Sequence, residues 1–77
     1  MIRRNDFERF LVNNYGCWTE LRGGDVYIYR QNGARVEHGT FGGHQHREVT
    51  PGMARGVLQD LGFTQAQITA IFAACGI

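Results

Sequence analysis

Residues 17–41, CWTELRGGDVYIYRQNGARVEHGTF, decide the fold of this chain. They contain three short runs that are typical of strands: Cys17 to Arg22, Val26 to Gln31 and Arg35 to Thr40. Gly23-Gly24-Asp25 separates the first two runs, and Asn32-Gly33 separates the last two. Because Asn-Gly tolerates the positive φ angles of a tight hairpin turn, the pattern predicts an antiparallel three-stranded meander.

Helical patterns flank these strands. Upstream, Asn5 with Glu8 three residues later predicts a capping box, followed by a helix from about Asp6 to Asn14 that ends at Gly16. Its apolar stripe consists of Phe7, Phe10, Leu11 and Tyr15. One amphipathic helix therefore precedes the sheet.

Two further helices are expected downstream. Thr50 caps the first of them, with Pro51 in its first turn and Gly62 at its end. Thr64 and Gln67 open the second, which Gly76 ends. The apolar stripes of these helices are Met53, Val57, Leu58 and Leu61, then Ile68, Ile71, Phe72 and Cys75.

The length and composition indicate one domain, residues 1–77, of the α+β class. The expected order is α-β-β-β-α-α, with helices on one face of a three-stranded antiparallel sheet. A chain of 77 residues with 43% hydrophobic and 19% charged residues has room for a single core. Bulk charge does not indicate a nucleic-acid partner, because eight arginines face seven acidic residues.

Several classes of protein are set aside. Two cysteines, Cys17 and Cys75, without a signal-like leader favour a reducing cytoplasm and two small buried side chains rather than a disulfide framework. The longest apolar run, Ala70 to Cys75, is far shorter than the ~20 residues that cross a bilayer, so no membrane role is expected. Nucleotide-binding and serine-hydrolase motifs are also missing, and no cofactor is expected.

The segment from Glu48 to Thr64, EVTPGMARGVLQDLGFT, carries a family resemblance. It resembles the acidic-apolar-x-x-Gly-x-x-Arg-x-x-Leu-x-x-x-Gly-x-Ser/Thr segment that forms the second helix of the HicA family of toxin ribonucleases. With the upstream helix and strands, the resemblance covers about Phe7 to Thr64. It implies a fold similar to a double-stranded RNA-binding domain, cleavage of messenger RNA, and a partner antitoxin that covers the toxin.

The catalytic turn of that family differs here. The family has Gly-Ser-His-His followed by an apolar and an aromatic residue, whereas this chain has Gly24-Asp25-Val26-Tyr27-Ile28-Tyr29. Metal-free RNA cleavage needs groups that accept and donate protons near neutral pH, as imidazole does. Val26 can do neither, and the phenol of Tyr27, ordinarily with a pKa of about 10, is a poor base. The resemblance therefore predicts a binding scaffold without the family's catalytic histidine.

The loop FGGHQHREV contains the next candidates, His44, His46 and Arg47. They could supply an acid, a base and a phosphate clamp as a relocated ribonuclease site, contact a substrate or partner, or be loop residues without a special role. No metal site is expected, because His-x-His offers only two ligands and no cysteine lies nearby.

Alternation along the strands suggests one further surface. Tyr27, Tyr29 and Arg30 could share a face with Trp18, Glu20 and Arg22, and such a face could stack RNA bases, bind a protein, or form an aromatic core under the helices. The residues expected to contact RNA or a partner are Arg22, Tyr27, Tyr29, Arg30, His44, His46, Arg47 and Arg55.

Three functions follow from these observations. The leading one is a HicA-like domain without catalysis that binds RNA or a protein, either a host protein or an antitoxin, in a toxin-antitoxin or mobile-element setting. The second is a phage or plasmid inhibitor, comparable to an anti-CRISPR protein, that blocks a host protein complex. The third is an active ribonuclease with a relocated site at His44 and His46.

A ribonuclease assay separates these hypotheses. Acid-base residues contribute about 10²- to 10⁴-fold each to a rate. With valine at the aligned position, the wild-type protein should cleave RNA no faster than a His44→Ala, His46→Ala double variant at neutral pH. RNA cleavage that the double variant abolishes would establish the relocated site.

Overall fold

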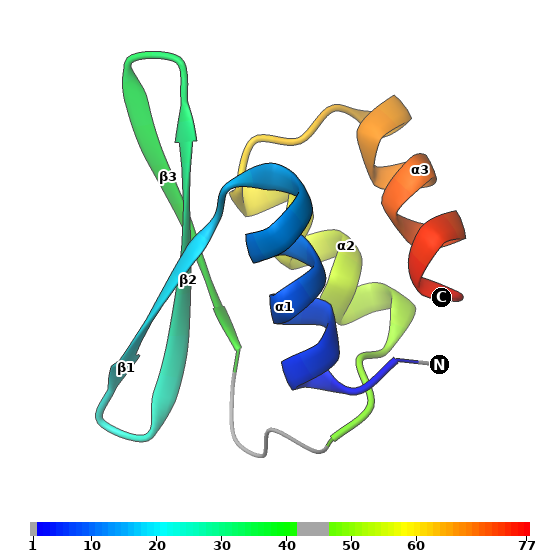
Figure 1. Ribbon diagram of the computed structural model, residues 1–77, viewed down its shortest axis with the longest axis horizontal. Helices are drawn as coiled ribbons and strands as arrows, with labels where there is room; N and C mark the ends of the chain where they lie inside the picture. The colour runs from blue at the N-terminus through cyan, green and yellow to red at the C-terminus, as the bar shows by residue number, and fades with distance from the viewer. Residues whose placement is uncertain (1, 42–46) are drawn as a thin grey trace.

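The computed structural model of the protein describes residues 2–41 and 47–77. Its elements are α1 (Arg4–Tyr15), β1 (Trp18–Arg22), β2 (Asp25–Asn32), β3 (Arg35–Phe41), α2 (Pro51–Asp60) and α3 (Gln65–Cys75). The strands form one antiparallel sheet in the order β1-β2-β3. All three helices lie on the same side of this sheet, and its other side is left open (Figure 1). The expected α+β architecture is confirmed.

Both hairpins use two-residue turns, and one differs from the expectation. Between β1 and β2, Gly23 and Gly24 have φ angles of 55° and 89°, so the chain reverses on glycine alone. Between β2 and β3, Asn32 pairs with Arg35, so the turn is Gly33-Ala34 and the predicted Asn32-Gly33 turn is wrong by one residue. Only Gly33 adopts a positive φ there, so Asn32 remains in the strand.

The start of α1 also differs from the expectation. The helix begins at Arg4, and its N-cap residue Arg3 makes no side-chain cap hydrogen bond, so the predicted Asn5–Glu8 capping box is wrong. Glu8 lies one turn after Arg4 instead, with Oε2 3.4 Å from the Arg4 Nε. The Arg4 amide donates to the Arg47 carbonyl at 2.8 Å, so the segment before α2 satisfies the free end of α1.

The first turns of α2 and α3, and the last turn of α2, confirm the capping predicted from the sequence. The Thr50 hydroxyl accepts from the Met53 amide, and Thr64 forms a complete capping box with Gln67. At the end of α2, the Gly62 and Phe63 amides donate to the carbonyls of Gln59 and Leu58, the pair of bonds that defines a Schellman motif. These local bonds explain why the sequence predicted both helices well.

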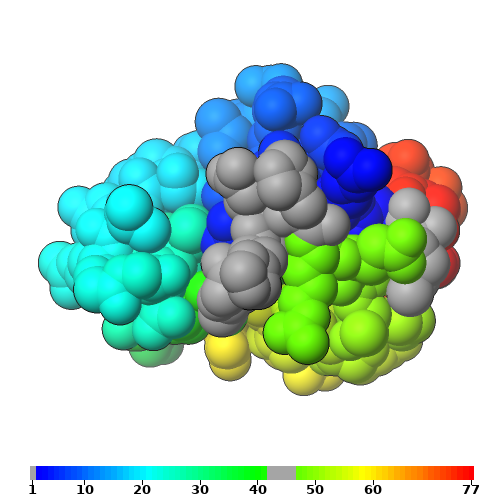
Figure 2. Space-filling view, turned by 90° about the horizontal axis from the view of Figure 1, so that it is seen from below, coloured from blue at the N-terminus to red at the C-terminus, as the bar shows by residue number. Residues whose placement is uncertain are grey.

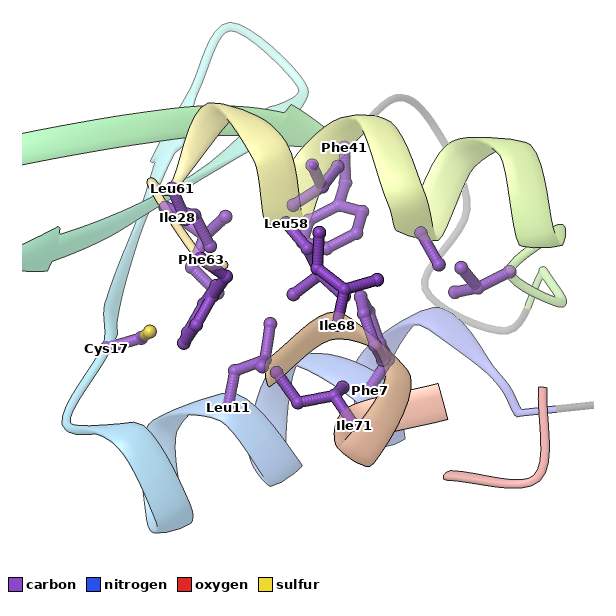
Figure 3. Packing of buried hydrophobic residues seen from close by; sticks show 13 residues of the cluster. Phe7, Leu11, Cys17, Ile28, Phe41, Leu58, Leu61, Phe63, Ile68 and Ile71 are labelled. Carbon is purple, nitrogen blue, oxygen red and sulfur yellow. The ribbon is translucent and has the colours of Figure 1, made fainter. Parts of the chain in front are cut away.

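A single apolar layer fills the space between the helices and the sheet. Phe7 of α1 meets Phe41 of β3 edge to face, with ring centroids 5.9 Å apart. Figure 3 shows side chains of the three helices and of the strands converging on this layer. Its buried members are Phe7, Leu11, Cys17, Ile28, Phe41, Val49, Ala54, Val57, Leu58, Leu61, Phe63, Ile68 and Ile71.

The two cysteines belong to this layer or its border. Cys17 is buried and Cys75 is half-buried, and both thiols are free. Burial raises the pKa of each thiol, with Arg30 partly opposing the rise at Cys17. Higher thiol pKa values leave less of the reactive thiolate, which suits structural side chains.

Helix α2 approaches the sheet most closely at Gly39 of β3. A Cβ at this position would lie 3.3 Å from Cγ1 of Val57 and 3.5 Å from the Val57 carbonyl oxygen. The separation of 3.3 Å is tighter than ordinary van der Waals contact. The absence of a side chain at Gly39 therefore lets the helix backbone rest on the strand.

Leu58 provides the test of this core. It is fully buried in the middle of α2, so Leu58→Ala should lower the free energy of unfolding by about 2 to 5 kcal/mol, because the cavity is only partly refilled. The neighbouring Gln59 is exposed, and Gln59→Ala should change the free energy by less than about 0.5 kcal/mol. Chemical denaturation of both variants measures the difference. Equal midpoints would contradict the described packing.

Candidate binding face

The side of the sheet away from the helices carries a row of rings that crosses all three strands. The strand register places Trp18 of β1 opposite Tyr29 of β2, and Tyr29 opposite His38 of β3. We call this side the open face; by strand alternation its main residues are Trp18, Glu20, Arg22, Asp25, Tyr27, Tyr29, Val36 and His38. In Figure 1 no helix covers it.

The rings of the open face contact one another. Trp18 and Tyr29 are stacked, with centroids 5.7 Å apart and an angle of 15° between the ring planes. His38 lies 6.1 Å from Tyr29 and 6.3 Å from Tyr27 between ring centroids. The Arg22 guanidinium lies 5.6 Å from the centroid of the Tyr27 ring. Each ring restricts its neighbour, so the row is ordered before any partner arrives.

The charges of the open face are few and do not favour phosphate. The Arg22 guanidinium lies 3.6 Å from the Glu20 carboxylate, as an exposed ion pair of little stabilising value. Asp25 pairs with Arg22 across the hairpin and adds a second carboxylate. With one arginine and two carboxylates, this face carries more acidic than basic charge.

The pKa of Tyr29 is raised above its ordinary value. Hydrogen bonding of its phenol to the Glu20 carboxylate raises the pKa of Tyr29 most, since that bond favours the protonated form. Partial desolvation and the negative charge of Glu20 raise it further, while Arg22 lowers it. Tyr29 therefore stays a neutral hydrogen-bond donor in neutral solution.

Arg30 does not belong to the open face, contrary to the expected grouping with Tyr27 and Tyr29. Arg30 lies one residue after Tyr29 and three after Tyr27. Because side chains alternate along a strand, Arg30 points to the opposite side of the sheet, toward the helices. Its Nη1 donates to the Leu61 carbonyl at 2.9 Å, and its guanidinium lies 4.0 Å from the centroid of the Phe63 ring. A cation here stabilises the carboxyl end of α2.

The other predicted contact residues lie elsewhere. The Arg55 guanidinium on α2 lies 5.3 Å from the centroid of the Phe72 ring on α3, so it links the two helices. Arg47 is exposed just before α2. His44 and His46 lie outside the described residues, and a relocated site there stays a prediction.

The two positions that align with the family's histidines point in opposite directions. Val26 is half-buried and packs against the core, whereas Tyr27 lies on the open face beside His38. Within residues 2–41 and 47–77 there is no pocket and no group of three or more metal-ligating side chains. The same residues contain no helix with the length and hydropathy needed to traverse a bilayer.

His38 and Asp25 were not singled out from the sequence. The signal that could have found His38 is the hairpin register, because a turn at Gly33-Ala34 places residue 38 opposite Tyr29. The predicted turn at Asn32-Gly33 places Val36 there instead. Asp25 was assigned to a turn, although it begins β2.

Comparisons with protein-family models, with curated proteins and with solved structures find no match to this chain. The HicA resemblance accordingly stays a prediction from the sequence, and the open face has to be interpreted from its own chemistry.

The link between Glu20 and Tyr29 can be measured directly. Glu20→Gln should lower the pKa of Tyr29, because the variant removes the negative charge that opposes ionisation of the phenol. Site-resolved NMR titration of the tyrosine ring carbons measures this value. Glu37→Gln is the matched control, because Glu37 pairs with Arg30 across the strands on the side of the sheet that faces the helices. An unchanged Tyr29 pKa in Glu20→Gln would show that the two side chains do not interact.

Proposed function

We propose that this domain acts by binding another protein, and that the open face is its contact surface. The observation that carries the proposal is the ordered row of Trp18, Tyr29 and His38 on a side of the sheet that no helix covers. Contiguous exposed apolar surface is a common mark of protein interaction sites. The HicA-like setting suggests a binding scaffold of this kind.

The composition of the face suits a protein partner. Tryptophan, tyrosine and arginine are the residues most enriched in interface hot spots, and Trp18, Tyr29 and Arg22 provide all three. Val36, 52% exposed, adds apolar surface beside them. Because the rings already restrain one another, binding them costs little side-chain entropy. We expect a partner surface with an apolar centre and a basic residue placed to meet Glu20 or Asp25.

RNA fits this face less well. Proteins that bind single strands combine stacking aromatic residues with a positively charged groove, and phosphate contacts supply most of their nonspecific affinity. Here Arg22 is paired with Glu20, and Arg30 is occupied by the end of α2. Stacking, at about 1 to 3 kcal/mol per base, would have to act against two carboxylates. The charges thus favour the protein over the nucleic acid.

The replaced histidine positions agree with a role in binding rather than cleavage. Val26 has no titratable group, and its side chain is directed into the core rather than toward Tyr27. A HicA-like scaffold that has lost this step can still bind an antitoxin, and a phage or plasmid inhibitor needs only to cover a host protein. The antitoxin-binding scaffold and the inhibitor both require a protein-binding surface, and neither requires a catalysed reaction.

Affinity purification with matched baits tests the proposal. Trp18→Ala and Tyr29→Ala should each lose the specific partner that the wild-type bait retains, whereas Arg55→Ala, altered on the helical side, should retain it. With the purified partner, each face variant should bind about 30-fold more weakly or worse, the loss expected at a hot spot. A partner that binds both face variants as well as the wild type would overturn the proposal.

A labelled single-stranded oligouridine provides the second arm of this test. Fluorescence anisotropy at physiological salt should show binding no tighter than the nonspecific range of about 10⁻⁴ to 10⁻⁶ M. The affinity should be the same for wild type and Tyr29→Ala. Tighter binding that both Trp18→Ala and Tyr29→Ala abolish would assign the open face to RNA instead.

A further inference from the structure

Strand β1 forms an uncovered edge of the sheet. Among residues 2–41 and 47–77 it pairs with β2 alone, and all five of its residues are exposed. Because the two-residue turn makes Arg22 and Asp25 a hydrogen-bonded pair, the hydrogen-bonded positions of β1 are Trp18, Glu20 and Arg22. The backbone groups of the intervening Thr19 and Leu21 point away from β2. They are ready to pair with another strand.

Two charged side chains, Glu20 and Arg22, are the main edge protection that β1 carries. The strand WTELR contains no proline and no lysine, and its register with β2 runs without a bulge. Leu21 is 75% exposed, the most of any large apolar residue in the described part of the chain. Its side chain lies on the same face as Val26, at the end of the hairpin that extends past the helices (Figure 1). An exposed leucine on an unpaired edge strand is a possible point of association with another strand.

The charges of β1 identify that partner as a second copy of the chain. Glu20 and Arg22 flank Leu21 on the strand, and they have opposite charges. If two β1 strands run antiparallel about a two-fold axis through Leu21, each Glu20 lies opposite Arg22 of the second copy. The same register places the two Leu21 side chains against each other and pairs their outward backbone groups.

The other registers that keep the faces aligned are less favourable. An axis through Glu20 would place two carboxylates directly opposite each other, and like charges in that position are destabilising. An axis through Thr19 would place Trp18 opposite Glu20 and leave Arg22 without an acidic partner. The charge pattern therefore selects the register centred on Leu21.

We propose that two copies of this protein associate through residues 20–22 of β1, so that their sheets join end to end into one six-stranded sheet. The geometry leaves room for the helices, because the axis lies at the free end of the β1–β2 hairpin. In Figure 2 this hairpin, in cyan, forms the side of the molecule opposite α3, in red. The two open faces then lie on the same side of the joined sheet. The inference does not depend on the proposed protein partner, since it requires only the chain itself.

A charge swap tests this dimer. Analytical ultracentrifugation of the wild type over a concentration series should show a reversible transition from monomer to dimer. Glu20→Arg and Arg22→Glu should each weaken the dimer about tenfold or more, since each variant creates two like-charge pairs across the axis. The double variant Glu20→Arg, Arg22→Glu should restore association, because the opposite charges again face each other.

Two further variants complete the test. Leu21→Asp should abolish the dimer while circular dichroism shows a folded chain, because the side chain is exposed in the monomer. Arg35→Glu changes an exposed charge at the other hairpin, on β3, and should leave the dimer unchanged. A wild type that stays monomeric, or single charge variants that dimerise as well as the wild type, would overturn the proposal. A double variant that fails to recover would exclude the Leu21 register.

Discussion

Val57 of α2 rests directly on the backbone of β3 at Gly39, and this close approach sets the separation between the helical layer and the sheet. At that separation, one layer of side chains fills the interior, so a chain of 77 residues closes a core without a second apolar layer. Arg30 of β2 adds a second link between the sheet and this helix, because its guanidinium donates to the Leu61 carbonyl at the end of α2. The packing of the whole domain therefore depends on a missing side chain.

A core built from one side of the sheet has a direct effect on the other side. Side chains alternate along each strand. Residues next to the core residues Ile28 of β2 and Phe41 of β3 therefore point to the side away from the helices. The rings on this side contact one another: Trp18 stacks on Tyr29, and His38 lies beside Tyr27 and Tyr29. Their mutual contacts partly shield them while no partner is bound. The arrangement leaves a set of packed rings on the surface of the sheet.

The sequence predicted the element order and the antiparallel sheet. It also predicted both downstream helices, because the Thr50 and Thr64 caps act within one turn of chain. The prediction from sequence failed where contacts between distant segments determine the structure. The start of α1 is set by the Arg47 carbonyl rather than by Asn5, and the direction of Arg30 is set by strand alternation and the end of α2. A shift of one residue in the second turn exchanged Val36 for His38 opposite Tyr29. The rings on the face were foreseeable, but their exact neighbours depended on register.

The separation of the core from the exposed rings also bears on how this domain can change over generations. Substitutions at Trp18, Tyr29 or His38 leave the apolar layer intact, because none of these side chains belongs to it. Variation on this surface therefore costs only the contacts between the rings, whereas variation at Leu58 or Gly39 disturbs the core packing. In the proposed binding role, residues of the open face could therefore be exchanged for others, and the contact surface altered, while the architecture is kept.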